Sequence, residues 1–414
     1  MQATAALLLL FATLLPAAVP VDEYRTRRAA VRERLSKDKA VLVLFGATEA
    51  ERGDLRNRFF QEPNFFYLTG WTDPGATLLL TPTAEYLFLP PPSEVNERYT
   101  GKKLNPTDPA APARTGVAQV LPAPKLEVTF YTALETAPKI YGLIDFNRPD
   151  LLRRLAGERK LDNAAPFLFP LRMRKSPAEI SLLRASVDVT LDAHRAAWRR
   201  ATAGLFEYQI GATMVNVYAE RGCERNAYPP IVGSGRNSTI LHYAKNDRRM
   251  DAGEVLLMDV GAECGMYAAD ITRTVPVNGK FSARQREIYD IVLAAQRAAI
   301  AAVRPGMTLA KTGEKSLYKI AYDVIEAKGY GKYFTHGLGH HIGLEVHDPG
   351  PPETPLEAGM VITIEPGIYI PEESLGVRIE DMVLVTPTGG ELLSKALPRE
   401  PEAVEKAMRH DRKP

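Results

Sequence analysis

Histidines are concentrated in one short stretch of the chain. Four of the seven lie in the sequence HGLGHHIGLEVHD, residues 336–348. Burying several imidazole rings together is unfavourable unless each ring finds a polar partner, so such clusters are typical of metal sites and proton-transfer sites. A packed core in which every ring is hydrogen-bonded is the alternative. Acidic residues on both sides of the stretch favour a metal site.

Two aspartates form the first acidic pair. Two β-rich runs between residues 254 and 277 flank Cys264-Gly265, where a two-residue hairpin turn is expected. Asp259 and Asp270 are equidistant from that turn, so they are predicted to stand opposite each other on one face of the hairpin. Carboxylates so placed have Cβ atoms about 4.5–5.5 Å apart and repel each other. A bound cation would neutralise them.

Two glutamates form the second pair in the same way. β-rich runs flank Glu372-Glu373, and Glu365 and Glu380 are equidistant from this dipeptide. The register assumes a symmetric loop, and a bulge just after Glu365 would shift it. A solvated strand face is the alternative for either pair taken alone. Two facing acidic pairs beside a histidine cluster favour a metal site instead.

Five residues are therefore candidate metal ligands: Asp259, Asp270, His340, Glu365 and Glu380. Four carboxylates and one imidazole form a hard, oxygen-rich set that suits manganese, cobalt, iron or zinc better than a thiolate-type structural zinc site. Because carboxylates can bridge, the set favours two ions, which lie about 3.5–4 Å apart in two-metal hydrolases. The predicted chemistry is hydrolysis by a water molecule whose pKa the metals lower.

The sequence resembles the pita-bread metallopeptidases, a family that includes aminopeptidase P, prolidase and methionine aminopeptidase. The resemblance is carried by five motifs that contain the five candidate ligands: MDVG, AADITRT, HGLGHHIGLEVHD, TIEPG and VRIED. Two further segments resemble the Xaa-Pro aminopeptidases, IVGSGRNSTILHY at residues 231–243 and RFFQEPNFFYLTGWTDPGATLLL at residues 58–80. The second of these belongs to the amino-terminal domain of aminopeptidase P, so the resemblance spans nearly the whole mature chain.

The resemblance implies a role for each site residue. Asp259 would hold one ion, and His340 and Glu365 would hold the other. Asp270 and Glu380 would bridge both ions. Glu365 also matches the carboxylate that takes the proton from the attacking water. Three further histidines match residues that hold the substrate, stabilise the tetrahedral intermediate or move protons: His242, His336 and His347.

Arg378 lies two residues before Glu380 in a predicted strand. Alternate residues of a strand point to the same face, so Arg378 is expected to orient the Glu380 carboxylate. An ordinary surface arginine is the alternative. The remaining histidines are expected to be structural, because they point away from the ligands or lack acidic neighbours at ligand spacing: His194, His341 and His410.

The elements that position these residues are predicted to form an α+β fold of two domains. Residues 22–165 are expected to form a smaller α/β domain, and residues 172–403 the catalytic domain, followed by a charged tail at residues 404–414. Capping boxes at Ser176 and Ser282 begin two long helices, each followed by another amphipathic helix and then by strands. This weak repeat of about 106 residues indicates two halves around a pseudo-twofold axis. The family's pita-bread fold, an antiparallel sheet flanked by helices, has that arrangement.

Composition bounds the remaining classes of function and location. The 414 residues carry a formal net charge of +2 without a basic stripe, which excludes nucleic acid as the expected partner. An apolar run at residues 5–15 predicts a secretory leader, residues 1–18, and hence a periplasmic or secreted protein. Because no positive charge precedes the run, a wrongly assigned start, a short membrane anchor and a cytoplasmic location are alternatives. No other stretch is apolar enough to cross a membrane.

Cys223 and Cys264 impose no disulfide framework and are expected to be free thiols.

Residues and resemblance together predict a manganese-dependent, dimetal Xaa-Pro aminopeptidase that acts on short peptides with proline in second position. The resemblance also implies a homo-oligomer whose subunits help to close the entrance. Cleavage before proline requires a shaped apolar wall, for which Tyr228, Ile231, Tyr369 and the histidines are candidates. A prolidase restricted to dipeptides shares every ligand and is the main alternative. A non-catalytic pita-bread binding protein and a creatinase-like amidinohydrolase are disfavoured because the ligand positions are intact.

Overall fold

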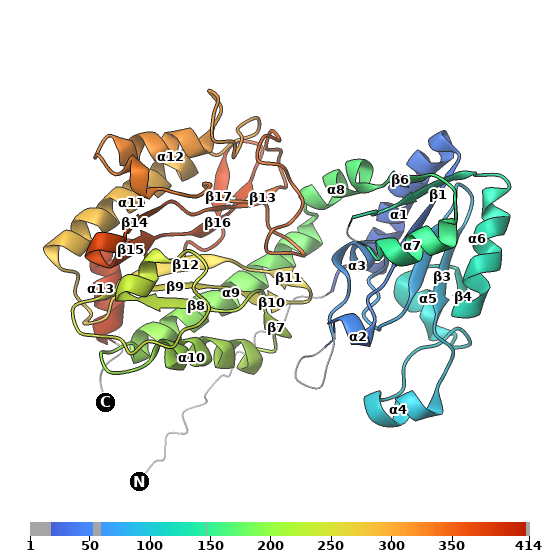
Figure 1. The fold of residues 1–414 in the computed structure, drawn as a ribbon, viewed down its shortest axis with the longest axis horizontal. Helices are drawn as coiled ribbons and strands as arrows, with labels where there is room; N and C mark the ends of the chain where they lie inside the picture. The colour runs from blue at the N-terminus through green and yellow to red at the C-terminus, as the bar shows by residue number, and fades with distance from the viewer. Residues whose placement is uncertain (1–17, 53–58, 146, 411–414) are drawn as a thin grey trace, which may run out of the picture.

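The computed structural model describes residues 18–52, 59–145 and 147–410, which form two domains (Figure 1). Helices α8 (Ala165–Met173) and α9 (Pro177–Arg200) run from the amino-terminal domain, on the right of Figure 1, into the carboxyl-terminal domain on the left. The predicted leader lies outside the described residues except for Ala18. Among the helices of the described residues, none has the length and apolar character needed to span a membrane.

A six-stranded mixed sheet forms the centre of the amino-terminal domain, in the order β4-β3-β2-β1-β5-β6. Its strands are β1 (Ala40–Phe45), β2 (Thr77–Leu80), β3 (Glu85–Leu89), β4 (Gln119–Pro122), β5 (Lys139–Gly142) and β6 (Leu161–Asn163). The helices of the domain are α1 (Val21–Asp38), α2 (Glu49–Arg52), α3 (Pro63–Thr69), α4 (Glu94–Thr100), α5 (Ala110–Thr115), α6 (Leu126–Leu134) and α7 (Pro149–Ala156).

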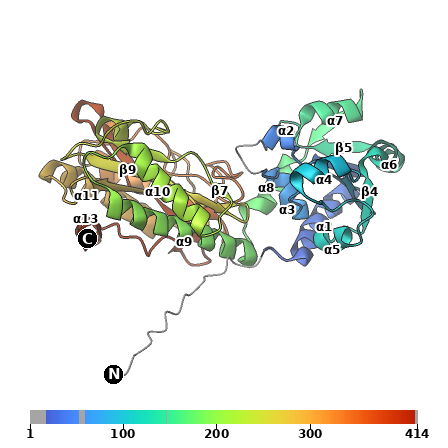
Figure 2. The same cartoon turned by 90° about the horizontal axis from the view of Figure 1, so that it is seen from below.

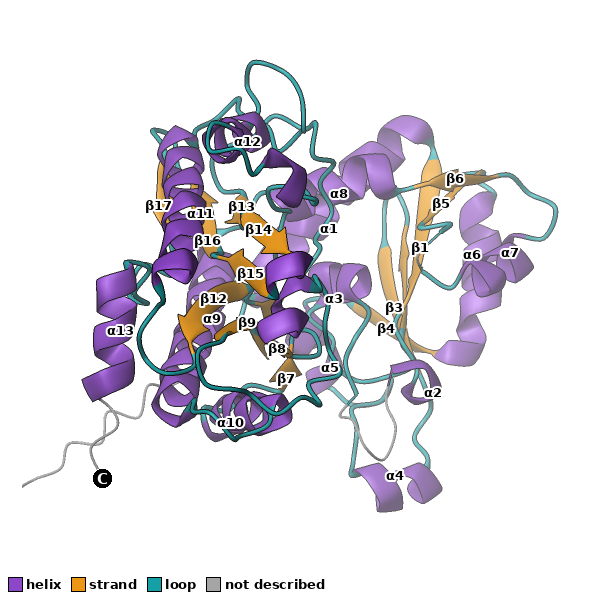
Figure 3. Cartoon of the chain, turned by 60° about the vertical axis from the view of Figure 1, so that its left-hand side comes forward, coloured by secondary structure: helices purple, strands orange, loops and turns teal. Residues whose placement is uncertain are grey.

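Strand β1 shows why helices cover both faces of this sheet. Its six residues, AVLVLF, are all buried, and successive side chains of a strand point to opposite faces. Leu42 and Leu44 belong to the core that contains apolar residues of α1, whereas Val41 and Val43 belong to the core that contains apolar residues of α6 and α7. The sheet therefore lies between α1 on one side and α6 and α7 on the other (Figure 3).

The carboxyl-terminal domain contains two pairs of helices. Both predicted capping boxes are formed: the Ser176 hydroxyl accepts from the Glu179 backbone N–H, and the Ser282 hydroxyl accepts from that of Gln285. These boxes begin α9 and α11 (Ala283–Ala302). Helix α10 (Glu207–Glu220) packs beside α9, as Figure 2 shows, and α12 (Leu317–Glu326) packs beside α11.

Short antiparallel sheets fill the space between the helix pairs (Figure 3). Their orders are β12-β9-β8, β11-β10-β7, β13-β16-β17 and β14-β15. The predicted α+β fold, with an antiparallel region flanked by helices, is confirmed. The strands are β7 (Arg225–Asn226), β8 (Ile231–Ser234), β9 (Val255–Val260), β10 (Ala262–Cys264), β11 (Tyr267–Ala268), β12 (Ile271–Pro276), β13 (Val361–Ile364), β14 (Gly367–Ile370), β15 (Leu375–Arg378), β16 (Asp381–Val385) and β17 (Gly390–Leu392).

Residues 404–410 do not form part of a separate charged tail, contrary to the prediction from the sequence. Helix α13 (Pro401–His410) packs against α9, and its Val404 and Met408 are fully buried in the core. Apolar residues four positions apart lie on one face of a helix, which explains how a charge-rich segment can dock. The catalytic domain therefore continues to the end of α13.

Candidate metal centre

The hairpin that carries the two aspartates has its turn one residue later than predicted. Gly265 and Met266 form the loop, with φ angles of 59° and 72°. Two positive φ values are typical of a type I′ turn, in which methionine is unusual, so the sequence did not indicate this position. Asp259 consequently pairs with Thr272. The prediction that Asp270 is its direct cross-strand partner is wrong.

The two aspartates nevertheless converge, because one hydroxyl group joins them. The Tyr228 hydroxyl lies 2.5 Å from Asp259 Oδ1 and also within hydrogen-bond distance of Asp270 Oδ1. A hydroxyl has one proton, so it can donate to only one carboxylate at a time. Gly261 permits the close approach of the chain segments, since a Cβ atom there would lie 1.7 Å from the Ala269 carbonyl oxygen.

The glutamate pair has the predicted register. The β13–β16 ladder ends with Ile364 opposite Asp381, and the β14–β15 ladder continues in the same register beyond Glu365 and Glu380. No bulge shifts the pairing between these two ladders. Glu365 and Glu380 therefore face each other at the junction of two short sheets.

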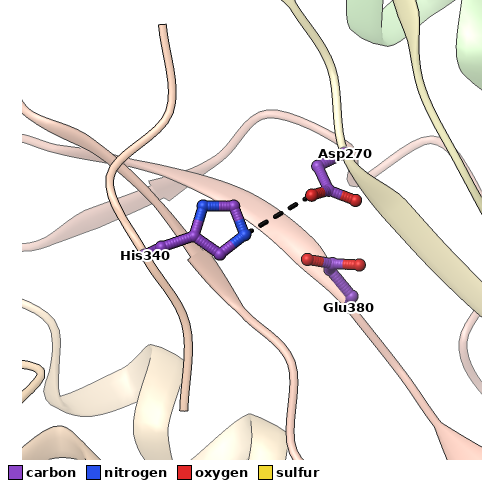
Figure 4. A group of neighbouring side chains, drawn as sticks. All are labelled: Asp270, His340 and Glu380. Carbon is purple, nitrogen blue, oxygen red and sulfur yellow. Dashed lines mark ion pairs between the residues drawn. The ribbon is translucent and has the colours of Figure 1, made fainter. Parts of the chain in front are cut away.

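Three of the five candidate ligands form a compact group (Figure 4). One ligand atom each of Asp270, His340 and Glu380 lies within 4.8 Å of the others. His340 Nε2 lies 3.4 Å from Asp270 Oδ2 and 3.4 Å from Glu365 Oε1. All five candidates, including Asp259, line one cavity of about 490 Å³. The structure thus brings together every residue that the sequence proposed as a ligand.

The electrostatics of this group fit a cation. Burial and the neighbouring carboxylates raise the pKa values of Asp270 and Glu380 well above their ordinary range, and burial raises that of Glu365. Glu380 Oε1 is buried and has no hydrogen-bond partner among the described residues. A buried acceptor without a donor is costly, and an oxygen-rich set with a free lone pair is what a hard divalent ion binds. The residues present therefore fit a divalent metal.

Arg378 is buried beside these acids and does not lie on the surface. Its Nη2 pairs with Asp259 Oδ2. Its Nε donates to Thr272 Oγ1 at 3.2 Å, and that hydroxyl donates to Glu380 Oε2 at 2.7 Å. Arg378 thus reaches Glu380 through Thr272, and it also donates to the Tyr369 hydroxyl at 2.9 Å.

The backbone carbonyl of His341 orients the His340 ring. His340 Nδ1 lies 3.1 Å from this oxygen, so Nδ1 carries the proton and Nε2 is left with a lone pair for a metal. Gly339 lets the chain approach strand β13 closely, because a Cβ atom there would lie 2.1 Å from the Thr363 carbonyl oxygen. The His341 side chain is buried and does not line the cavity, as expected for a residue pointing to the opposite side.

The three non-ligand histidines occupy different places. The His347 ring packs edge-to-face on that of His340, with centroids 4.3 Å apart, and lines the cavity. His242 is exposed and lines the cavity as well. His336 does not line it, but its Nδ1 lies 4.0 Å from Glu365 Oε2. Burial lowers the pKa of His336 to about 3 and that of His347 to about 4, so both rings are neutral near pH 7.

The cysteines form a disulfide, so the expectation of free thiols is wrong. Cys223 and Cys264 have Cα atoms 4.4 Å apart, a separation that the fold creates between the end of α10 and strand β10. Neither cysteine is available as a ligand. His194 is buried and lies 3.0 Å from the Ile271 carbonyl oxygen through Nε2, which is a structural role. The backbone of His410 ends α13, and its side chain lies outside the described part of the chain.

Two hydroxyl groups at the site were missed by sequence reasoning. Thr272 follows Asp270 by two residues, so strand alternation was a usable signal that both side chains share a face. Tyr228 was assigned to an apolar wall, and no local signal connects it with the aspartates. Its contacts with them arise when β7 pairs with β10 and β8 pairs with β9, on either side of Tyr228.

Comparisons with known proteins agree on one family. The sequence profile of metallopeptidase family M24 matches residues 181–387, and that of the aminopeptidase P N-terminal domain matches residues 24–141. The chain belongs to metallopeptidase family M24. The chain is 34% identical to the Xaa-Pro aminopeptidase of Haemophilus influenzae, and the alignment covers 95% of this chain and 98% of that protein. It is 33% identical to the Xaa-Pro aminopeptidase of Escherichia coli, with 94% and 97% covered.

Solved structures give the same result for the fold. Aminopeptidase P from Escherichia coli, in complex with the inhibitor Pro-Leu, matches with a TM-score of 0.87 at 31% identity. The match covers 96% of this chain and 100% of that one. The M24 chain therefore has the aminopeptidase P fold, with the amino-terminal domain preceding a pita-bread domain.

Proposed function

We propose that the protein is a metal-dependent aminopeptidase that removes the amino-terminal residue preceding a proline. The observation that carries the proposal is the convergence of five potential ligands from distant segments on one cavity, with a buried oxygen of Glu380 left free. Support comes from relatives named Xaa-Pro aminopeptidase, which this chain matches over almost their full length.

Two divalent ions are the proposed cofactor, with manganese as the first choice and cobalt, zinc or iron as alternatives. Asp259, Asp270, His340, Glu365 and Glu380 would hold these ions. One solved structure of the Escherichia coli relative is zinc-substituted, which keeps zinc among the alternatives. When bound, such ions lower the pKa of water and polarise the peptide carbonyl group.

The side chains around the ligands supply proton transfer and positioning. Glu365 lines the cavity, and a carboxylate beside the attacking water can accept its proton and pass it on. His347, a neutral ring, and His242, an exposed one, both line the cavity. They are the proposed contacts to the peptide. His336 lies next to Glu365 but does not line the cavity. It can act on the substrate only if the peptide reaches past the Glu365 carboxylate.

Selection for proline needs apolar surface, because the imide nitrogen has no proton to be recognised. Tyr228 and Ile231 line the cavity and are the proposed apolar wall. Tyr369 does not line it and instead bonds to His336 and Arg378, so its role is to hold those two side chains. Tyr228 and Ile231, but not Tyr369, are therefore in a position to contact substrate, as are the histidines that line the cavity.

Hydrolysis of a peptide panel by metal-reconstituted protein tests the proposal. The panel contains Xaa-Pro dipeptides, Xaa-Pro-Yaa tripeptides and longer peptides, with Xaa-Ala-Yaa as the matched control. We expect turnover of the proline tripeptides by wild type and its loss, together with bound metal, in Asp270→Ala. Turnover of dipeptides alone would instead indicate a prolidase, an alternative kept by 38% identity to the Xaa-Pro dipeptidase of Pyrococcus furiosus over 62% of this chain. Absence of both metal and turnover would favour a binding protein.

We also propose that the protein works outside the cytoplasm as a homo-oligomer. The disulfide between Cys223 and Cys264 supports the location, because such bonds persist in oxidising compartments. Fractionation of the source cells, with thiol labelling of the denatured protein, tests it. Accessible thiols in a cytoplasmic fraction would refute the proposed location.

Sedimentation analysis of the purified protein tests the oligomeric state, and a monomer at micromolar concentration would refute the proposed homo-oligomer.

A further inference from the structure

One buried arginine joins the amino-terminal domain to the histidine-rich loop. Arg172 lies in α8, the helix between the domains, and is 2% exposed. Its Nη1 donates to Asn64 Oδ1, in α3 of the amino-terminal domain, at 2.6 Å. Its Nη2 donates to Asp348 Oδ1 at 2.5 Å and to Glu345 Oε2 at 2.9 Å. These two acids belong to the loop of residues 336–348, which carries His340.

The contacts continue from Asp348 to the ring of His340. The Asp348 backbone N–H donates to the His341 carbonyl oxygen at 2.9 Å, and the same oxygen lies 3.1 Å from His340 Nδ1. A fixed carbonyl at this position sets both the tautomer and the direction of the imidazole. The side chain of Arg172 therefore fixes Asp348, and the backbone N–H of Asp348 fixes the His341 carbonyl. This carbonyl directs His340 Nε2 toward the acidic group.

A second cation strengthens the hold on Asp348. Lys175 Nζ, in the segment between α8 and α9, lies 3.1 Å from Asp348 Oδ2. Burial alone would raise the pKa of Asp348, but Arg172 and Lys175 keep it below its ordinary value. Asp348 is thus a charged, buried anchor with both oxygens engaged, and its two cationic partners come from the connection between the domains.

We propose that Arg172 is a positioning residue of the metal centre, which makes the orientation of His340 depend on docking of the amino-terminal domain through Asn64. The inference rests on the proposed function only in taking His340 as a metal ligand. A purely structural salt bridge would change stability alone. A positioning residue must also change metal affinity and the order of the loop.

Manganese titration and amide hydrogen exchange test this role. Metal-stripped wild type, Arg172→Met and Arg172→Lys are titrated with Mn²⁺ by calorimetry, and exchange is followed in residues 336–348. We expect Arg172→Met to bind Mn²⁺ about 10–100-fold more weakly, the loss typical when a group supporting a ligand is removed, and to exchange faster in that loop. Arg172→Lys keeps the charge and is expected to recover part of the affinity. The matched control is Arg174→Met, because Arg174 is two residues away but pairs on the surface with Glu357, and it should behave as wild type.

The outcome that overturns the proposal is a folded Arg172→Met with wild-type Mn²⁺ affinity and wild-type exchange in the loop. If Arg172→Met does not fold, Arg172→Lys and Asn64→Ala decide, since each removes part of the contact set. Asn64→Ala is expected to weaken Mn²⁺ binding a few-fold, and unchanged affinity in both variants overturns the proposal. A wild type that binds Mn²⁺ but cleaves no proline peptide would refute the proposed function without touching this inference.

Discussion

The buried acids predict that the metal-free protein is destabilised by its own metal centre, and that Asp270→Asn relieves this. Ligand oxygens of Asp270 and Glu380 lie within 4.8 Å of each other. Two unit charges at that distance repel by about 3 kcal/mol at an effective dielectric constant of about 20. Protonation limits the repulsion, because burial and the nearby Asp259 raise the pKa of Asp270. We therefore expect the variant to raise the free energy of unfolding of the metal-free protein by about 1–3 kcal/mol at pH 7.

Saturating metal should reverse the order of stability. At an Mn²⁺ concentration of about 100 times the dissociation constant, binding adds about 2.7 kcal/mol to the native state of wild type. Asp270→Asn keeps an oxygen that can accept from Tyr228 but loses the charge of a proposed bridging ligand, so its gain should be small. Wild type is thus the less stable protein in chelator and the more stable protein in manganese.

Urea denaturation with EDTA and with Mn²⁺ measures both differences. In a Trp71→Phe background the remaining tryptophan, Trp198, lies in α9 and reports on the catalytic domain. Asp290→Asn is the matched control, because Asp290 pairs with Arg286 on the surface of α11. This substitution should change the free energy of unfolding neither in EDTA nor in Mn²⁺. The reasoning is refuted if metal-free Asp270→Asn is less stable than metal-free wild type, or if both gain equally from manganese.

Three further predictions follow from single contacts. His347→Ala is expected to lower kcat for a proline tripeptide by about 10²–10⁴-fold with the metal content unchanged, and loss of metal would make His347 a ligand instead. Burial lowers the pKa of His194 to about 3, so the unfolded chain binds the proton more readily and stability falls as the pH drops below about 6.5. Between pH 8 and pH 5, metal-free wild type should lose about 2 kcal/mol more than His194→Gln in urea denaturation, and equal losses would contradict a neutral buried ring. The disulfide closes a separation of 41 residues, so Cys223→Ser/Cys264→Ser should be about 4 kcal/mol less stable than oxidised wild type but equal to wild type reduced with a dithiol.

Local signals in the sequence predicted much of the catalytic domain. Capping boxes at Ser176 and Ser282 gave the first residues of α9 and α11, because the cap and its partner lie three residues apart in the chain. Counting from the loop gave the register of Glu365 and Glu380, because that loop is symmetric about its centre. Sites whose geometry is set within one hairpin or one helix start are accessible to this reasoning.

The features that were missed depend on contacts between distant segments or on unusual backbone angles. Met266 adopts a positive φ, which its side chain disfavours, so the type I′ turn had no sequence signal and the aspartate register was placed wrongly. The Cys223–Cys264 bond needs α10 and β10 to meet, and spacing alone does not show this. Arg172 looked like one basic residue among many, because its acidic partners lie more than 170 residues away.

The two halves of the catalytic domain orient each other's ligands. Thr272, from the first half, donates to Glu380 of the second half, and Arg378, from the second half, pairs with Asp259 of the first. Each half alone would hold two repelling carboxylates and would lack the contact that the other half supplies to one of them. A bound cation would add attraction among the carboxylates of both halves, so metal binding and docking of the halves must stabilise each other. The ligands of the two halves thus meet within one cavity although the first and the last are more than a hundred residues apart in the sequence.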